Sequence, residues 1–443
     1  MSFPCAVFPE EVDYCVGSLR CFQVADIGSK SWFDQYEITL KLTQQAYIEA
    51  STKQEEVIKE RIIIDSKLPT LVHEVFCISI WKGKVLPKLL QGKSLDASFV
   101  LYSVLYYEVN LVALLETILF HRNSCEALGE CTLDLIDYST KSVGFLIGIV
   151  NQERLQNTVA AENLHESVQE EIERLKRDID FRIGLKCLTI LNYLVDNLET
   201  LPLSAVNLLI KTHDTPCLLS EILHVKPWLR KRKGFEQFLN DRWEPVYGGE
   251  IFKVTKSEAQ AWFCLFGLLF NKNVMADYEI NEFRQREIGK CIGLLNEQLL
   301  DQLPALVQLK QHLCSFQMKA GSSGRNRVNL LLEELPEISN SIWNTANKYG
   351  WRKIIENHKQ IFINISSQEL SEMAKRLSTA YNTDLLEKYS STEQSDLHTY
   401  CSTCKKTAEK KCSKCESVFY CSRDCQVKDW PQHKELCHQL KAL

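Results

Sequence analysis

The chain has 443 residues, a formal net charge of −5 at pH 7 and a pI near 6.1, with 45% hydrophobic and 25% charged residues. This composition is typical of a globular protein long enough for more than one domain. The slightly acidic balance excludes a global basic field that would attract nucleic acid or an anionic membrane, so we expect no direct nucleic-acid partner.

The first residues lack a basic stretch followed by an apolar one, so they do not predict a signal peptide. The most apolar long stretch, residues 99–120, contains Glu108, Asn110 and Glu116. Such side chains are costly in hydrocarbon but common on a partly exposed helix. We therefore predict a core helix here and no membrane span.

From about residue 10 to residue 383, apolar residues recur at helical spacing, and few runs alternate as strands do. Leu185, Leu188 and Leu191 form one such face. Gly184, directly before it, is a candidate helix boundary, because glycine costs a helix interior about 1 kcal/mol relative to alanine. The pattern predicts a mainly α fold.

A weak repeat indicates how these helices are arranged. Segments 68–76, 215–223 and 303–313 each have a proline as their second residue (Pro69, Pro216 or Pro304), followed by an apolar pair, as in the first turn of a helix. Stacked helix pairs of the armadillo or HEAT kind would bury such faces against their neighbours. Three coincidental helix starts are the alternative.

Polar segments mark other boundaries. The basic run from Arg230 to Lys233 predicts an exposed turn, with an acidic partner as the alternative. Ser366 and Glu369 have the spacing of a capping box, so a last helix should begin there. We assign residues 1–386 to the helical scaffold domain, 387–400 to a linker, 401–437 to a cysteine-rich module and 438–443 to a tail.

Seven of the eighteen cysteines lie within this module. Four pairs of potential metal ligands follow one another: Cys401 and Cys404, Cys412 and Cys415, Cys421 and Cys425, and His433 and Cys437. Each C-x2-C pair can reach one ion, and a gap of three residues places two ligands on successive helical turns. Eight ligands predict two tetrahedral structural zinc ions, Zn²⁺, and a module that folds only with metal.

Spacing alone does not show which pairs share an ion, and His398 or His438 could replace His433, with poorer spacing. The whole pattern, including Tyr420 before Cys421, resembles the MYND-type zinc finger. This resemblance implies interleaved ligation: Cys401, Cys404, Cys421 and Cys425 on one zinc, and Cys412, Cys415, His433 and Cys437 on the other.

Two observations predict that the module binds proteins. Four protein ligands on each zinc leave no position for a reactive water, and the zinc-loaded module has a net charge of only about +1. Gln426 and Trp430 would share a helical face that suits an extended proline-containing peptide, and MYND fingers that bind such peptides carry a Gln and a Trp at similar positions. Packing of Trp430 inside the module is the alternative.

We predict no catalytic site. MYND fingers also occur in SET-type lysine methyltransferases, but here Asn357 and His358 are not followed by the cysteine of the cofactor motif. No G-x-S-x-G or H-E-x-x-H motif is present either.

Blocks 68–87, 215–228 and 299–313 resemble a family of MYND-finger proteins that act in cytoplasmic preassembly of axonemal dynein arms. The resemblance implies a co-chaperone-like adaptor whose finger binds a leucine-rich-repeat dynein assembly factor and whose helical body binds dynein chains and chaperones. It also implies residence in the cytoplasm, at centriolar satellites and in dynein assembly particles. A nuclear corepressor adaptor that recruits proline-rich peptides is the alternative.

Overall fold

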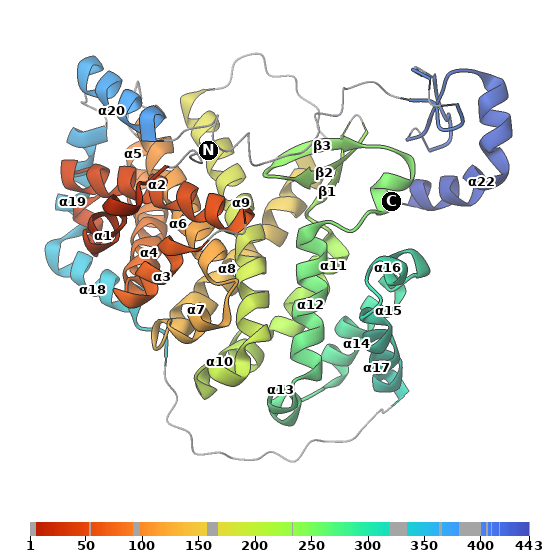
Figure 1. Cartoon of the computed structure of the whole chain (residues 1–443), viewed down its shortest axis with the longest axis horizontal. Helices are drawn as coiled ribbons and strands as arrows, with labels where there is room; N and C mark the ends of the chain where they lie inside the picture. Colours follow the sequence, from red (N-terminus) through yellow and green to blue (C-terminus); the bar gives the residue numbers. More distant parts are fainter. Residues whose placement is uncertain are drawn as a thin grey trace.

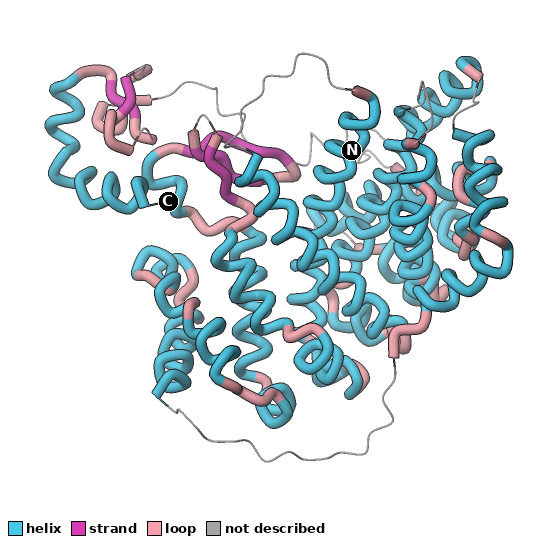
Figure 2. The backbone as a smooth tube through the Cα atoms, turned by 180° about the vertical axis from the view of Figure 1, so that it is seen from behind, coloured by secondary structure: helices cyan, strands magenta, loops and turns pink. Residues whose placement is uncertain are grey.

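The computed structural model describes residues 6–52, 55–91, 98–156, 167–232, 234–318, 335–362, 366–380, 400–404, 406–408, 410–415 and 417–442. These residues are mainly helical, which confirms the predicted fold class (Figures 1 and 2). Whether the helices follow an armadillo arrangement stays a prediction.

The N-terminal third is a cluster of helices. It consists of α1 (Pro9–Gly17), η1 (Val24–Asp26), α2 (Lys30–Thr52), α3 (Val57–Ile64), α4 (Leu68–Lys84), α5 (Leu86–Leu90), α6 (Ser98–Ile118) and α7 (Arg122–Glu126). The helix α6 packs against both α2 and α4. It is long and apolar enough to cross a membrane, but 72% of its apolar window is buried inside the protein. It is therefore the predicted core helix.

One detail of this helix differs from the sequence expectation. Glu108 does not lie on a solvated face but is fully buried, where it accepts hydrogen bonds from Lys82 and Tyr138. A buried carboxylate requires such partners, because desolvation of its charge is otherwise prohibitive.

The centre of the molecule is built around one long helix, α9 (Val168–Asp196), which packs against α6, α8 (Cys131–Gln156) and α12 (Lys256–Phe270). Its predicted face of Leu185, Leu188 and Leu191 is buried. Gly184 is inside this helix and not at a boundary. A Cβ there would lie 3.1 Å from Leu146 Cβ on α8, so glycine permits the close approach of α8 and α9.

The remaining central helices are η2 (Leu198–Thr200), α10 (Leu203–Asn207), the π-helical turn η3 (Leu208–Thr212), α11 (Thr215–Val225), α13 (Lys272–Asp277), α14 (Glu282–Gly289), α15 (Cys291–Leu294), α16 (Glu297–Gln302) and α17 (Leu306–Met318). Pro69 and Pro216 lie in the first turns of α4 and α11, as predicted. Pro304 instead precedes α17, so the third predicted helix start was two residues early.

A three-stranded antiparallel sheet interrupts the helices, and the sequence pattern did not predict it. Its strands are β1 (Leu229–Lys231), β2 (Phe235–Leu239) and β3 (Arg242–Val246). Asn240 and Asp241 connect β2 to β3 with φ of 49° and 59°, as a two-residue hairpin turn requires. Of the basic run predicted as an exposed turn, Arg230 and Lys231 instead lie in β1, where Arg230 pairs with Glu236 and stacks on Trp243. Arg232 follows the strand and is exposed, as predicted, and Lys233 lies outside the described residues.

The helices α18 (Ile338–Tyr349), α19 (Trp351–Phe362) and α20 (Ser367–Ala380) return to the N-terminal cluster. His358 Nε2 lies 3.0 Å from the carbonyl oxygen of Ile27, to which it donates a hydrogen bond. The ring of Phe362 fills the place that a side chain would need at Gly28, whose φ is +87°. Figure 1 shows the consequence: the blue helices lie beside the red and orange ones.

Two predictions concern the end of this domain. The capping box is confirmed, because Ser366 and Glu369 exchange side-chain and backbone hydrogen bonds at the start of α20. Of the predicted linker, residues 387–399 lie outside the described residues.

Candidate metal centre

The cysteine-rich module, residues 400–442, contains two short antiparallel strands and one helix. The strands are β4 (Lys410–Lys411) and β5 (Phe419–Tyr420), and the helix is α22 (Arg423–Ala442). Backbone hydrogen bonds from Cys401 N to Lys406 O and from Cys412 N to Val418 O close the two cysteine turns.

The first ligand group contains Cys401, Cys404, Cys421 and Cys425, whose sulfur atoms all lie within 4.8 Å of one another. Cys404 Sγ is 3.3 Å and Cys425 Sγ is 3.6 Å from Cys421 Sγ. Sulfur atoms about 2.3 Å from one tetrahedral zinc would be about 3.8 Å apart, so the group fits one ion.

The second group contains Cys412, Cys415, His433 and Cys437, all of them buried. Cys412 Sγ lies 3.9 Å from Cys437 Sγ, and Cys415 Sγ lies 3.5 Å from His433 Nε2. These separations fit a second tetrahedral zinc. The structure therefore groups the eight predicted ligands in the interleaved order that the MYND resemblance implied, and they fit two structural zinc ions.

The ligands differ in pKa: neighbouring thiols raise the pKa of Cys421 and burial raises that of Cys437, whereas Cys401 and His433 are shifted towards their metal-binding forms. Burial raises the pKa of the Cys401 thiol, but amide hydrogen bonds from Cys421, Cys404 and Thr403 outweigh it and lower this pKa to about 6. Burial likewise lowers the pKa of His433 and keeps its imidazole neutral, against the opposing charge of Asp429. Thiolate and neutral imidazole are the forms that bind zinc.

Of the two alternative histidines, the structure describes only His438, which does not join the ligands. His438 Nε2 instead lies 3.1 Å from Lys414 Nζ, and His398 lies outside the described residues. The residues assigned to a tail, 438–443, are not separate from the module: α22 continues to Ala442, and Leu440 on its last turn is fully buried.

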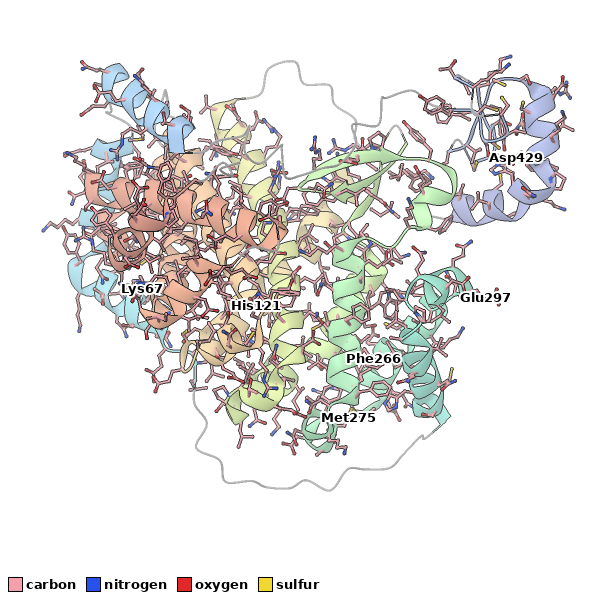
Figure 3. The ribbon with its side chains drawn as sticks, in the orientation of Figure 1. Lys67, His121, Phe266, Met275, Glu297 and Asp429 are labelled. Carbon is pink, nitrogen blue, oxygen red and sulfur yellow. The ribbon has the colours of Figure 1, made fainter. Side chains whose placement is uncertain are left out.

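Hydrogen bonds outside the ligand groups fix α22 against the strands. The Tyr420 hydroxyl donates to Asp429 Oδ2 at 2.6 Å, and the Thr403 hydroxyl donates to the carbonyl of Cys425. Figure 3 labels Asp429 on this helix. The tyrosine of the sequence motif therefore positions the helix that carries His433 and Cys437.

The module packs against the sheet of the helical domain. The backbone N–H of Gly248, in η4 (Gly248–Phe252), donates to the carbonyl of Ser417 at 3.1 Å. The rings of Tyr247 and Phe419 meet edge to face at 5.0 Å. One buried cluster includes Phe235, Val246 and Ile251 of the domain with Val418, Phe419 and Leu440 of the module. Figure 1 shows the sheet and η4 on the side of the helical domain that faces the module.

The other candidate surface lies on the first half of α22. Gln426 is half-buried, Trp430 is 37% exposed and its ring also contacts His433. Val427, which the sequence reasoning missed, is 63% exposed three residues before Trp430. These three side chains, Gln426, Val427 and Trp430, make up the α22 face; Val427 is a common apolar residue with no motif to mark it.

These features define the class: a mainly helical protein with a C-terminal two-zinc finger of the MYND type, a module that presents a surface for other proteins. A family model described as "MYND finger" matches residues 401–437. The chain is also 40% identical, over 97% of its length, to the zinc finger MYND domain-containing protein 10 homolog of Drosophila melanogaster, 98% of which is covered. The chain therefore belongs to the family of zinc finger MYND domain-containing protein 10.

Shorter similarities reach two other proteins. The SET domain and MYND-type zinc finger protein 6 of Schizosaccharomyces pombe is 41% identical over 54 residues, 12% of this chain and 11% of that protein. The ubiquitin carboxyl-terminal hydrolase 19 of Arabidopsis thaliana is 55% identical over 43 residues, 10% of this chain and 6% of that protein. Both are too short to cover the helical body. No solved structure matches the chain.

Proposed function

We propose that the protein is a non-enzymatic adaptor in the cytoplasmic preassembly of axonemal dynein arms, the process that supplies motile cilia. One observation carries the proposal: two closed zinc groups fold a module that leaves Gln426, Val427 and Trp430 together on the α22 face. Closed zinc sites have no vacancy for a reacting water, so this module acts through its surface.

The α22 face suits an extended peptide that contains proline. The exposed part of the Trp430 ring offers a flat apolar surface for a pyrrolidine ring, and the Gln426 amide, one turn earlier, can bond to a peptide backbone. We propose that this face binds the leucine-rich-repeat dynein assembly factor that the sequence resemblance implies.

The helical body would then bind the proteins that take part in dynein assembly. Membership of the protein 10 family extends over 97% of the chain, so the body belongs to the conserved plan of this family and is not an addition to a finger. We propose that it binds dynein chains and chaperones, in the cytoplasm, at centriolar satellites and in dynein assembly particles.

Trp430→Ala tests the peptide surface. Loss of an anchoring tryptophan costs about 2 kcal/mol or more, so capture of the leucine-rich-repeat factor from ciliated cells should fall roughly 30-fold. Bound zinc should stay at the wild-type amount. Phe145→Ala, at a 70% exposed ring on α8, is the matched control and should capture the factor normally.

Two results would refute the proposal. Undiminished capture by Trp430→Ala would show that the α22 face is not the binding surface. A tagged protein concentrated in the nuclei of ciliated cells, with corepressor peptides captured in place of dynein factors, would favour the corepressor adaptor.

A further inference from the structure

A third group of metal-ligand side chains lies far from the finger, on the N-terminal half of α4. His73, Glu74 and Cys77 each offer one ligand atom, and these atoms all lie within 4.8 Å of one another. The imidazole of His73 also interacts with the thiol of Cys21, in the segment that precedes η1. The helix α4 therefore brings one nitrogen, one carboxylate and one sulfur together, and a second sulfur lies beside the imidazole outside this group.

Two separations among His73, Glu74 and Cys77 are close to those of a tetrahedral site. Cys77 Sγ lies 3.9 Å from His73 Nδ1, which lies 3.5 Å from Glu74 Oε1. Bond lengths of about 2.3 Å to sulfur and about 2.0–2.1 Å to nitrogen or oxygen predict separations of about 3.6 Å and 3.3 Å. The corresponding distance in the finger, from Cys415 Sγ to His433 Nε2, is 3.5 Å.

The local sequence also repeats a finger pattern. His73 and Cys77 have the same spacing, on successive turns of a helix, as His433 and Cys437. In both pairs the cysteine is nearly inaccessible to solvent. Cys21, by contrast, is exposed, so an ion can reach the group from solvent on that side.

The buried carboxylate of this group requires a cation, which is either the protonated imidazole of His73 or a metal ion. Glu74 is 1% exposed and accepts hydrogen bonds from two neutral donors, the backbone N–H of Phe22 and the hydroxyl of Tyr107. Among the described residues, its one ion-pair partner is His73. A divalent ion would neutralise the buried part of the group, because its charge of +2 offsets the Glu74 carboxylate and the Cys77 thiolate, while the Cys21 thiolate is exposed to solvent.

We propose that His73, Glu74 and Cys77 bind a third zinc ion on α4, and that the Cys21 thiol beside the imidazole completes the site and fastens the segment before η1 to this helix. Two sulfurs and a nitrogen favour zinc over magnesium or calcium, which prefer oxygen ligands. Binding releases the thiol protons of Cys21 and Cys77, so the 3.0 Å contact in which Cys77 Sγ donates to Phe22 O is replaced by the metal bond. The competing occupant is a proton on His73, shared with Glu74 and Cys77.

Metal counting on the full chain separates the two occupants. Protein produced with ample zinc and purified under reducing conditions should contain three zinc ions per chain. Cys77→Ser should contain two. Cys187→Ser is the matched control, because Cys187 is an equally buried helical cysteine outside the three groups, and it should still contain three. A wild-type chain with two zinc ions would overturn the proposal.

A second variant covers a failure of Cys77→Ser to fold. Cys21 is exposed, so Cys21→Ser does not disturb the core and leaves three ligands. One of the three zinc ions should then be removed by a chelator at least tenfold more easily than in the wild type. After cobalt substitution, its thiolate charge-transfer absorbance should also fall. Retention of all three ions with unchanged absorbance in Cys21→Ser would overturn the proposal.

Discussion

Val418→Ala would test whether the finger is held against the sheet in solution. Val418 is 5% exposed, and its Cγ2 would contact a Cβ placed on Gly248 at 3.6 Å. The substitution removes two methyl groups from this contact. At about 0.8 kcal/mol for each, the docked state should lose about 1.6 kcal/mol. Because 1.4 kcal/mol is a factor of ten, docking should weaken roughly 15-fold.

Hydrogen exchange at the Gly248 amide measures this effect directly, since its acceptor is the carbonyl of Ser417 in the finger. The amide should exchange roughly 15-fold faster in Val418→Ala, with bound zinc unchanged. Val427→Ala, at an exposed position of α22, removes the same two methyl groups and should leave the exchange rate alone. Equal exchange rates at Gly248 in both variants and in the wild type would refute the docking.

Two further predictions concern the helical body. Gly184→Ala should lower the free energy of unfolding by about 1–3 kcal/mol, because its Cβ meets Leu146 at 3.1 Å. Gly144→Ala, with open space around it on α8, should instead raise the free energy of unfolding by about 0.5–1 kcal/mol. Urea denaturation that gives the same sign for both variants would contradict this packing. Burial lowers the pKa of His358 from 6.5 to about 4, against its hydrogen bond to Ile27, so the unfolded chain binds a proton that the folded chain does not. His358 should therefore lower the free energy of unfolding by about 2 kcal/mol between pH 7 and pH 5. In His358→Gln the total fall over this pH range should be smaller by that amount. An equal fall in the variant and the wild type would exclude the effect.

The metal centre was the most predictable part of the molecule, because its ligands are recognised by their short spacing in the sequence. A C-x2-C turn or a His433–Cys437 helical pair is a local feature, and local features can be recognised without knowledge of the tertiary structure. The grouping of the pairs was not local. It came from the resemblance to a known finger, and the structure places the ligands in the same two groups.

The sheet and its contact with the finger were missed for the opposite reason. The strand β1 has three residues, two of them basic, so it carries no alternating apolar signal. The strand β1 is stabilised by its pairing with β2. The Arg230 side chain is held by its ion pair with Glu236 and by its stacking on Trp243. Likewise, Ser417 and Val418 belong to no motif that would predict a contact with residues about 170 positions earlier in the chain.

Single residues could not be interpreted without their neighbours. A glycine in a helical pattern is compatible with a helix end or with close packing, and only the position of α8 decides between them for Gly184. Glu108 is compatible with solvent or with a buried ion pair, and only the position of Lys82 decides. In both cases the deciding residue lies on another helix.

The return of α18–α20 to the first helices has a consequence for how the chain is made. His358 and Phe362 cover Ile27 and Gly28, although more than 330 residues separate them. A nascent chain emerging from the ribosome therefore leaves the N-terminal cluster partly uncovered until Phe362 has been synthesised. Any premature stop before Phe362 would release a polypeptide that exposes apolar surface and becomes a substrate for chaperones and proteases.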